Sequence, residues 1–289
     1  MKYVSALAAR TLGTVLLILA GIHCALGQAA PAPAPQPSPP TNDVHVRASQ
    51  TLVDASLDND PAVDKMVAVY SPKVRELDTV IGFLKGELRK GGTGAGSLGN
   101  FVTDGMRIQA NRKLGQPIDV AIVNGGGLRR SALSEGDLHI RDIFELLPFE
   151  NALVTLELTG EQLTELLTVI TANREAQSGA RVVYFTKADK TTGIVSVRLR
   201  DANKTEIPID PKGTYRIVTI DYLVTRGGDK FGVLQQGKNV KPLGLTLRDS
   251  ILDYVRAETA AGRQIRPNLD GRFAYDRTKS EATEEVPPQ

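Results

Sequence analysis

Residues 118–130 read IDVAIVNGGGLRR, and this stretch decides how the chain is expected to fold. Its first part, 118–123, is a continuous apolar run, which is typical of a fully buried strand. The run breaks at Asn124 into three glycines, and Arg129 and Arg130 follow. Glycines let backbone N–H groups converge on an anion, and an arginine can add a two-pronged donor. The stretch predicts a turn after a buried strand, with either a structural or an anion-binding role.

Periodic patterns on both sides of this turn predict alternating helices and strands. Apolar residues at helical spacing predict helices at 60–70, 101–114, 140–147, 160–170 and 247–262. The last two helices begin with the spacing of a capping box. Thr159 precedes Gln162 by three residues, and Thr246 precedes Asp249 by three. Short apolar or alternating runs predict strands at 118–123, 154–158, 181–186, 194–200 and 214–220, and residues 77–84 fit either a strand or a helix. The fold class is therefore mixed α/β, with the strand order left open.

Four local signals set the expected boundaries of these elements. Pro72 ends the first helix, because proline lacks the N–H that a helix requires. Asn100 is the expected cap of the second helix. Pro148 ends the third, which leaves Phe149 just past a helix end. Residues 226–229, RGGD, are expected to close the last strand with a second glycine turn.

Residues 1–27 have the pattern of a signal peptide that is removed on export. Lys2 and Arg10 lead into a short apolar run, and residues 25–27 form a small-x-small cleavage site. We therefore expect a periplasmic or secreted chain without a membrane anchor. The remaining sequence predicts an Ala/Pro-rich linker at 28–43, one folded domain at 44–275 and a disordered tail at 276–289.

Processing would also change the charge and the redox chemistry of the chain. Lys2 and Arg10 are lost with the signal, which leaves 33 basic residues against 33 acidic ones. A neutral chain without a basic run argues against nucleic acid as a partner. Cys24 is also lost, so the expected mature chain has no disulfide.

Few residues of the expected mature chain suit catalysis. His45 and His139 are its histidines, whereas a hydrolytic two-metal site usually joins several imidazoles with carboxylates. We therefore expect no metal cofactor in this chain, and we interpret His139 as a solvated loop residue. Asp142 and Glu145 are expected to face solvent rather than to act as an acid pair. No G-x-S-x-G motif marks a serine nucleophile.

A set of residues suited to binding remains. Phe149 and Tyr222 each lie next to a loop, where they either belong to the core or sandwich a flat base. Asp229 follows two glycines and is either a turn residue or an acceptor for the two hydroxyls of a ribose. With Asn124 and Arg129, the set would supply base, sugar and phosphate contacts.

Four segments, in this order, resemble the C-terminal, substrate-binding domain of the 5'-nucleotidase family: LGNFVTDGMR (98–107), DVAIVNGGGLR (119–129), LLPFENALVTLELTG (146–160) and TIDYLVTRGGDKF (219–231). The similarity extends over residues 62–273. The resemblance implies the layered sheets and helices of that domain. The substrate-binding residues that it implies are Asn124, Gly126, Gly127, Arg129, Phe149, Tyr222 and Asp229.

The resemblance also implies a role for each of these residues. Asn124 and Arg129 would contact the phosphate region of the substrate. Phe149 and Tyr222 would hold the base between them, and Asp229 would bind the ribose hydroxyls.

Two departures from the family pattern shape the expected function. Residues 94–96, GAG, stand where the family commonly has an arginine and an acidic residue, so one phosphate clamp is expected to be lost. The metallophosphatase domain that binds the metals in this family is also expected to be absent. The chain is then a nucleotide-binding domain that serves nucleotide hydrolysis with a separate metallophosphatase subunit. The alternatives are a free-standing periplasmic nucleotide or nucleoside receptor and a structural module with a decayed pocket.

Overall fold

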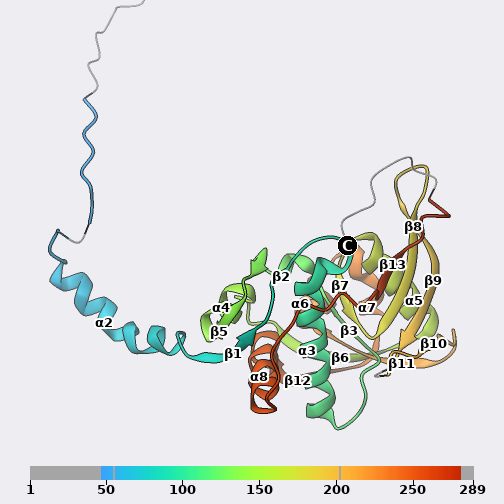
Figure 1. Ribbon diagram of the computed structural model, residues 1–289. Coiled ribbons are helices and arrows are strands. Elements are labelled where there is room, and N and C mark those ends of the chain that lie inside the picture. Colours follow the sequence, from blue (N-terminus) through green and yellow to red (C-terminus); the bar gives the residue numbers. More distant parts are fainter. Residues whose placement is uncertain (1–46, 55, 202, 281–289) are drawn as a thin grey trace, which may run out of the picture. The chain divides into compact units, whose positions relative to one another are not determined.

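The computed structural model describes residues 47–54, 56–201 and 203–280, and Figure 1 shows how its elements are arranged. The chain divides into two units, 1–58 and 59–289. The described residues of the first unit form no helix or strand. The predicted signal peptide and linker, 1–43, lie outside the described residues. Among the described residues, no helix is long and apolar enough to cross a membrane.

The second unit alternates helices and strands, which confirms the mixed α/β class. Its helices are α2 (Pro61–Glu76), α3 (Gly96–Leu114), α4 (Ile140–Leu146), α5 (Gly160–Ala172), α6 (Asp221–Arg226), α7 (Gly232–Gln235) and α8 (Leu247–Ala260), with the short 3-10 turns η1 (Thr93–Ala95), η2 (Gly125–Gly127) and η3 (Asp229–Phe231). Its strands are β1 (Val80–Leu84), β2 (Leu88–Arg89), β3 (Val120–Val123), β4 (Ala132–Leu133), β5 (Gly136–His139), β6 (Ala152–Thr159), β7 (Ala176–Ser178), β8 (Ala180–Thr186), β9 (Thr192–Arg200), β10 (Glu206–Pro208), β11 (Thr214–Ile220), β12 (Lys238–Thr246) and β13 (Phe273–Tyr275).

A five-stranded sheet with the order β12-β6-β11-β3-β7 forms the centre of this unit. Strand β3 is buried along its whole length, as its continuous apolar run predicts. It pairs parallel with β11 and antiparallel with β7. Strand β6 pairs antiparallel with both β11 and β12. The predicted turn at Asn124 therefore leaves the sheet between two buried neighbours.

A second sheet has the order β10-β9-β8-β13, in which β8 and β9, the strands predicted at 181–186 and 194–200, form a hairpin (Figure 1). Helix α5 contacts strands of both sheets, because its apolar face is broad enough to serve two layers. Its start is the predicted capping box: the Thr159 hydroxyl accepts from Gln162 N–H at 3.2 Å, and the Gln162 side chain accepts from Thr159 N–H at 2.9 Å. Thr246 also accepts from Asp249 N–H as predicted, at 3.0 Å.

Two predicted helix boundaries are wrong. The first helix continues through Pro72 to Glu76, because a proline removes one hydrogen bond without ending every helix that contains it. Helix α3 begins at Gly96 rather than after Asn100. Gly96 has a φ of 64°, a left-handed conformation that glycine adopts readily, and this lets the chain enter the helix without a side-chain cap. Asn100 is buried instead, and its side-chain amide donates to Asn268 O at 2.7 Å.

The structure also settles the segments around β5 and β11. Residues 80–84 form strand β1, which pairs with β5. His139 is not a loop residue, since it ends β5 and precedes α4. Asp142 is not a free surface acid, because it accepts from His139 N–H at 2.7 Å. The glycines at 227–228 do not close β11 directly, because helix α6 intervenes.

Candidate functional site

One edge of the five-stranded sheet collects the ends of four neighbouring strands. Ile220 at the end of β11 is paired with Leu153 near the start of β6, and Val123 at the end of β3 is paired with Ala176 at the start of β7. Because β3 and β11 are parallel and in register, these two pairs lie at the same level of the sheet. The residues just beyond this edge are Phe149, Tyr222, Asn124 and Glu175.

The aromatic residues at this edge are half-exposed. The exposed fraction is 48% for Phe149 and 46% for Tyr222, so neither ring is a core residue. Tyr222 lies in the first turn of α6, where its N–H donates to the Asp221 carboxylate at 2.8 Å. Exposed rings beside a sheet edge can stack on a flat ligand, since every base has a face suited to an aromatic partner.

A buried arginine holds the segment that carries Phe149. Arg248, in the first turn of α8, donates to Leu147 O at 3.5 Å and to Pro148 O at 3.4 Å. It also pairs with Glu150 at 3.2 Å, and its guanidinium carbon lies 4.2 Å from the centre of the Phe144 ring. The backbone before Phe149 is therefore anchored to α8, whereas the ring itself remains accessible.

The glycine turn is η2, directly after β3. Asn124 precedes it in an extended conformation, and its side-chain oxygen is buried without a hydrogen-bond partner among the described residues. Gly127 lies close to this oxygen, because a Cβ at Gly127 would lie 3.3 Å from Asn124 Oδ1. Gly126 is exposed at the tip of the turn. The turn therefore offers an unpaired acceptor.

The two arginines that follow the turn differ. Arg130 pairs with Glu145, a partly exposed carboxylate on α4. Arg129 is exposed, and its guanidinium carbon lies 5.9 Å from the centre of the Phe149 ring. Its side chain also donates to Gly126 O at 3.4 Å. Arg129 thus contacts both the glycine turn and the Phe149 ring.

A buried carboxylate that the sequence did not point to lies against the turn. Glu175 is 6% exposed, and its carboxylate accepts a hydrogen bond from Gly125 N–H. The other carboxylate oxygen pairs with the ammonium of Lys230, which lies 5.3 Å from the centre of the Phe231 ring. Glu175 therefore connects the glycine turn η2 with η3, which follows the glycines at 227–228. No motif marks it, because its role depends on the register that places the start of β7 beside the end of β3.

The altered loop 94–96 lies next to this turn. A Cβ at Gly125 would lie 3.7 Å from Ala95 Cβ and 3.9 Å from Lys90 Cε. The Lys90 ammonium donates to Leu128 O at 2.9 Å. Asp229 begins η3, and its side chain lies outside the described part of the structure.

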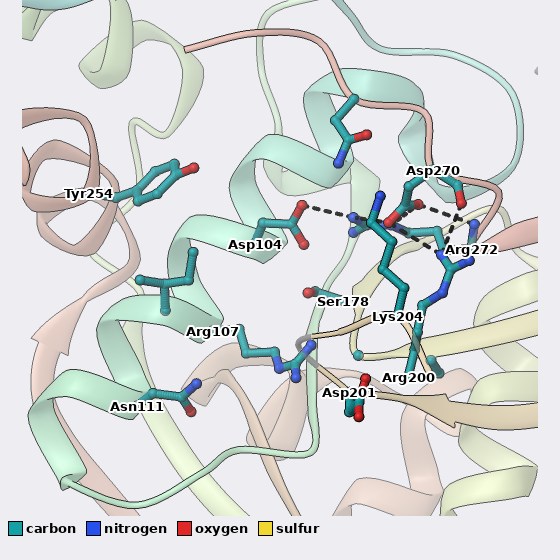
Figure 2. Close-up of a pocket in the computed structure, with 14 residues that line it drawn as sticks. Asp104, Arg107, Asn111, Ser178, Arg200, Asp201, Lys204, Tyr254, Asp270 and Arg272 are labelled. Carbon is teal, nitrogen blue, oxygen red and sulfur yellow. Dashed lines mark hydrogen bonds and ion pairs between the residues drawn. The ribbon is translucent and has the colours of Figure 1, made fainter. Parts of the chain in front are cut away.

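A charged cavity of about 360 Å³ lies at the opposite edge of the sheet (Figure 2). Arg107, which lines it, donates to Ile118 O, just ahead of β3, at 3.0 Å. Arg272 lies between the carboxylates of Asp104 and Asp270, each at 2.8 Å. Burial alone would lower the pKa of Arg272, but these two carboxylates outweigh it and raise that pKa. Arg200 donates to Asp270 O at 2.9 Å. Because Arg272 and Arg200 are engaged in this way, we interpret the cluster as a structural network.

The sequence model of the family described as 5'-nucleotidase, C-terminal domain, matches residues 77–236. The chain is 29% identical over 184 residues to the trifunctional nucleotide phosphoesterase protein YfkN of Bacillus subtilis, covering 61% of this chain and 12% of that protein. It is 30% identical over 178 residues to an apyrase of Tabanus yao, covering 55% of this chain and 32% of that protein.

A solved structure shows the same fold. The 5'-nucleotidase precursor of Thermus thermophilus superposes with a TM-score of 0.60 at 26% identity, covering 75% of this chain and 43% of that chain. The chain therefore spans less than half the length of each of these three relatives. Since the family match covers more than half of its 289 residues, the chain belongs to the family of 5'-nucleotidase C-terminal domains.

Proposed function

We propose that this chain is an exported nucleotide-binding domain, with its site at the sheet edge that carries Phe149 and Tyr222. The observation that supports this most is the pair of half-exposed rings beside the glycine turn. The rings would stack on the base, and Asp229 would bind the ribose hydroxyls. Asn124 and Arg129, with Gly126 and Gly127 of the turn between them, would contact the phosphate region of the ligand. Relatives described as a nucleotide phosphoesterase and an apyrase support a nucleotide-related ligand.

Hydrolysis would be performed with a separate metallophosphatase chain. The described residues hold no group of three or more His, Cys, Asp or Glu side chains placed to bind a metal ion. The divalent metals would therefore belong to the partner, and this chain would hold the substrate. The purified chain, given Mg²⁺, Mn²⁺ or Zn²⁺, should release no phosphate from AMP. Phosphate release that persists in highly purified protein would contradict this division of labour.

A second candidate is a free-standing periplasmic receptor for nucleotides or nucleosides, in which hydrolysis plays no part. Residues 94–96, GAG, favour it, because the arginine that the family commonly has there for the phosphate is missing. Affinity purification of the tagged chain from its native envelope, with identification of the bound proteins, separates the two candidates. Recovery of a metallophosphatase supports the first, and a chain recovered without one supports the second.

A further inference from the structure

The loop at 94–96, where the family commonly has an arginine and an acidic residue, is packed too closely to carry large side chains. Gly94 and Gly96 have φ values of 82° and 64°, a left-handed conformation that favours glycine. A Cβ at Gly94 would lie 2.4 Å from Phe273 Cε2, and a Cβ at Gly96 would lie 2.5 Å from Arg89 O. A cation at either position would require a different backbone, so a replacement has to come from a neighbouring segment.

Lys90 lies in such a segment, directly after β2. Strand β2 pairs antiparallel with β4, and Lys90 N–H continues the pairing by donating to Ser131 O at 2.8 Å. This pairing places the Lys90 backbone beside the segment that leaves the glycine turn η2. The side chain reaches back to the turn, where its ammonium donates to Leu128 O at 2.9 Å. A Cβ at Gly125 would lie 3.9 Å from Lys90 Cε. Strand pairing and this hydrogen bond together hold the ammonium at the turn.

The charges around the turn leave Lys90 available to an anion. The Glu175 carboxylate is engaged on both oxygens, by Gly125 N–H and by the Lys230 ammonium, so its charge is balanced. Among the described residues, no carboxylate forms an ion pair with Lys90 or with Arg129, and the hydrogen bonds of both side chains go to backbone carbonyls. An ammonium has three N–H groups, of which one carbonyl uses one. The turn therefore carries two uncompensated positive charges on exposed side chains.

We propose that Lys90 binds the phosphate of the ligand, in place of the arginine that the family commonly has at 94–96, and that the ligand class is nucleotides, with free nucleosides bound less tightly. The phosphate would accept charge-assisted hydrogen bonds from Lys90 and Arg129. A lysine can replace the arginine from another segment, because its ammonium is a point charge on a flexible stem and does not require the fixed geometry of a guanidinium. This inference rests on the proposed function, since it assumes that Phe149 and Tyr222 hold the base.

The test is calorimetric titration of the purified chain with AMP and with adenosine at neutral pH and low salt, where charge pairs are least screened. The wild type should bind AMP more tightly than adenosine. Lys90→Met removes the charge and keeps most of the side-chain length. It should weaken AMP binding ~10-fold or more, as expected for the loss of a charge-assisted hydrogen bond. The adenosine affinity should change less than ~2-fold, because adenosine has no phosphate for the ammonium to contact.

Two comparisons separate a phosphate contact from a structural role. Lys90→Arg keeps the positive charge and should retain most of the preference for AMP. Lys85→Met removes an exposed lysine just after β1 and is the matched control, which should leave both affinities unchanged. Added salt should weaken AMP binding by the wild type more than by Lys90→Met, because one charge pair fewer is there to be screened in the variant.

The outcomes distinguish this inference from the proposed function. An AMP affinity that Lys90→Met leaves unchanged, or that falls by the same factor as the adenosine affinity, would overturn the inference and leave the proposed function standing. A wild type that binds neither ligand would overturn both. Should Lys90→Met not fold, Lys90→Gln, whose amide can still donate to Leu128 O, takes its place with the same expected results.

Discussion

Arg248 links the packing of α8 to the position of Phe149. Its guanidinium is buried, donates to two backbone carbonyls and lies over the Phe144 ring at 4.2 Å. Each carbonyl would lose a partner if this side chain were shortened or made apolar. Arg248 is therefore a positioning residue for the segment that carries Phe149.

Replacing Arg248 with Met should test this role. Arg248→Met keeps much of the volume but leaves the carbonyls of Leu147 and Pro148 unpaired, so the free energy of unfolding should fall by about 1–3 kcal/mol. Adenosine should also bind more weakly, because Phe149 is held less firmly. Urea denaturation and calorimetry measure the two effects. Arg256→Met, on the same helix with an exposed ion pair to Asp253, should change stability by less than about 0.5 kcal/mol. Equal effects of the two variants would show that Arg248 has no special role.

The site was only partly predictable at this scale. The sequence indicated Phe149 and Tyr222 because each follows an element boundary that local patterns can locate. Glu175 carries no such signal, since it lies in the short link between α5 and β7. Its contact with Gly125 arises from the pairing of β3 with β7, and a single sequence does not specify which strands pair.

At the scale of elements, the packing of α3 on α8 supports the sheet from one side. The two helices lie in contact (Figure 1). The centres of the Phe101 and Tyr254 rings are 6.0 Å apart. Gly105 permits the close approach, because a Cβ there would lie 2.7 Å from Tyr254 Cδ1 and 2.9 Å from Ile251 Cδ1. The sequence predicted both helices from their apolar spacing. It did not predict the first turn of α3, because the entry at Gly96 depends on backbone conformation rather than on a capping side chain.

A bulky substitution at Gly105 should separate these helices. Gly105→Leu forces a side chain into a filled interface, and such overpacking costs about 1–3 kcal/mol even though leucine favours helix. Thermal unfolding followed by circular dichroism should show a lower melting temperature. Gly232→Ala at the start of α7, where an added Cβ would meet nothing within 4 Å, should leave the melting temperature within a few degrees. A Gly105→Leu protein as stable as the wild type would contradict the close approach.

At the scale of the whole domain, the proposed binding edge and the charged cavity lie at opposite ends of one sheet. The cavity network joins α3, the link before β13 and the end of β9 through Asp104, Asp270, Arg272 and Arg200 (Figure 2). Burial alone would raise the pKa of Asp270, but its hydrogen bonds and ion pairs with Arg272, and the charge of Arg200, hold that pKa below its usual range. The network thus makes stability depend on pH, and it lies apart from the proposed ligand site.

The domain should lose stability in acid through Asp270. A carboxyl whose pKa is depressed in the folded state stabilises fully above its unfolded pKa of about 4, and that contribution is lost as the pH falls through the folded pKa. The free energy of unfolding should therefore decrease below about pH 4. Asp270→Asn should lower stability at pH 7 and flatten this acid dependence, as urea titrations at several pH values would show. An unchanged slope in the variant would mean that other carboxyls account for the acid dependence.

Calorimetric titration of adenosine into the wild type and into Tyr222→Ala tests the central claim, that this sheet edge binds a nucleobase between two aromatic rings. Tyr222 is 46% exposed, so the variant should keep the wild-type melting temperature. It should lose about 1–3 kcal/mol of binding free energy, as expected when one stacking ring is removed. Phe83→Ala, at a partly exposed ring on β1, should bind like the wild type. A wild type that binds no adenosine, or a Tyr222→Ala variant that binds it equally well, would contradict the assignment of this edge as the ligand site.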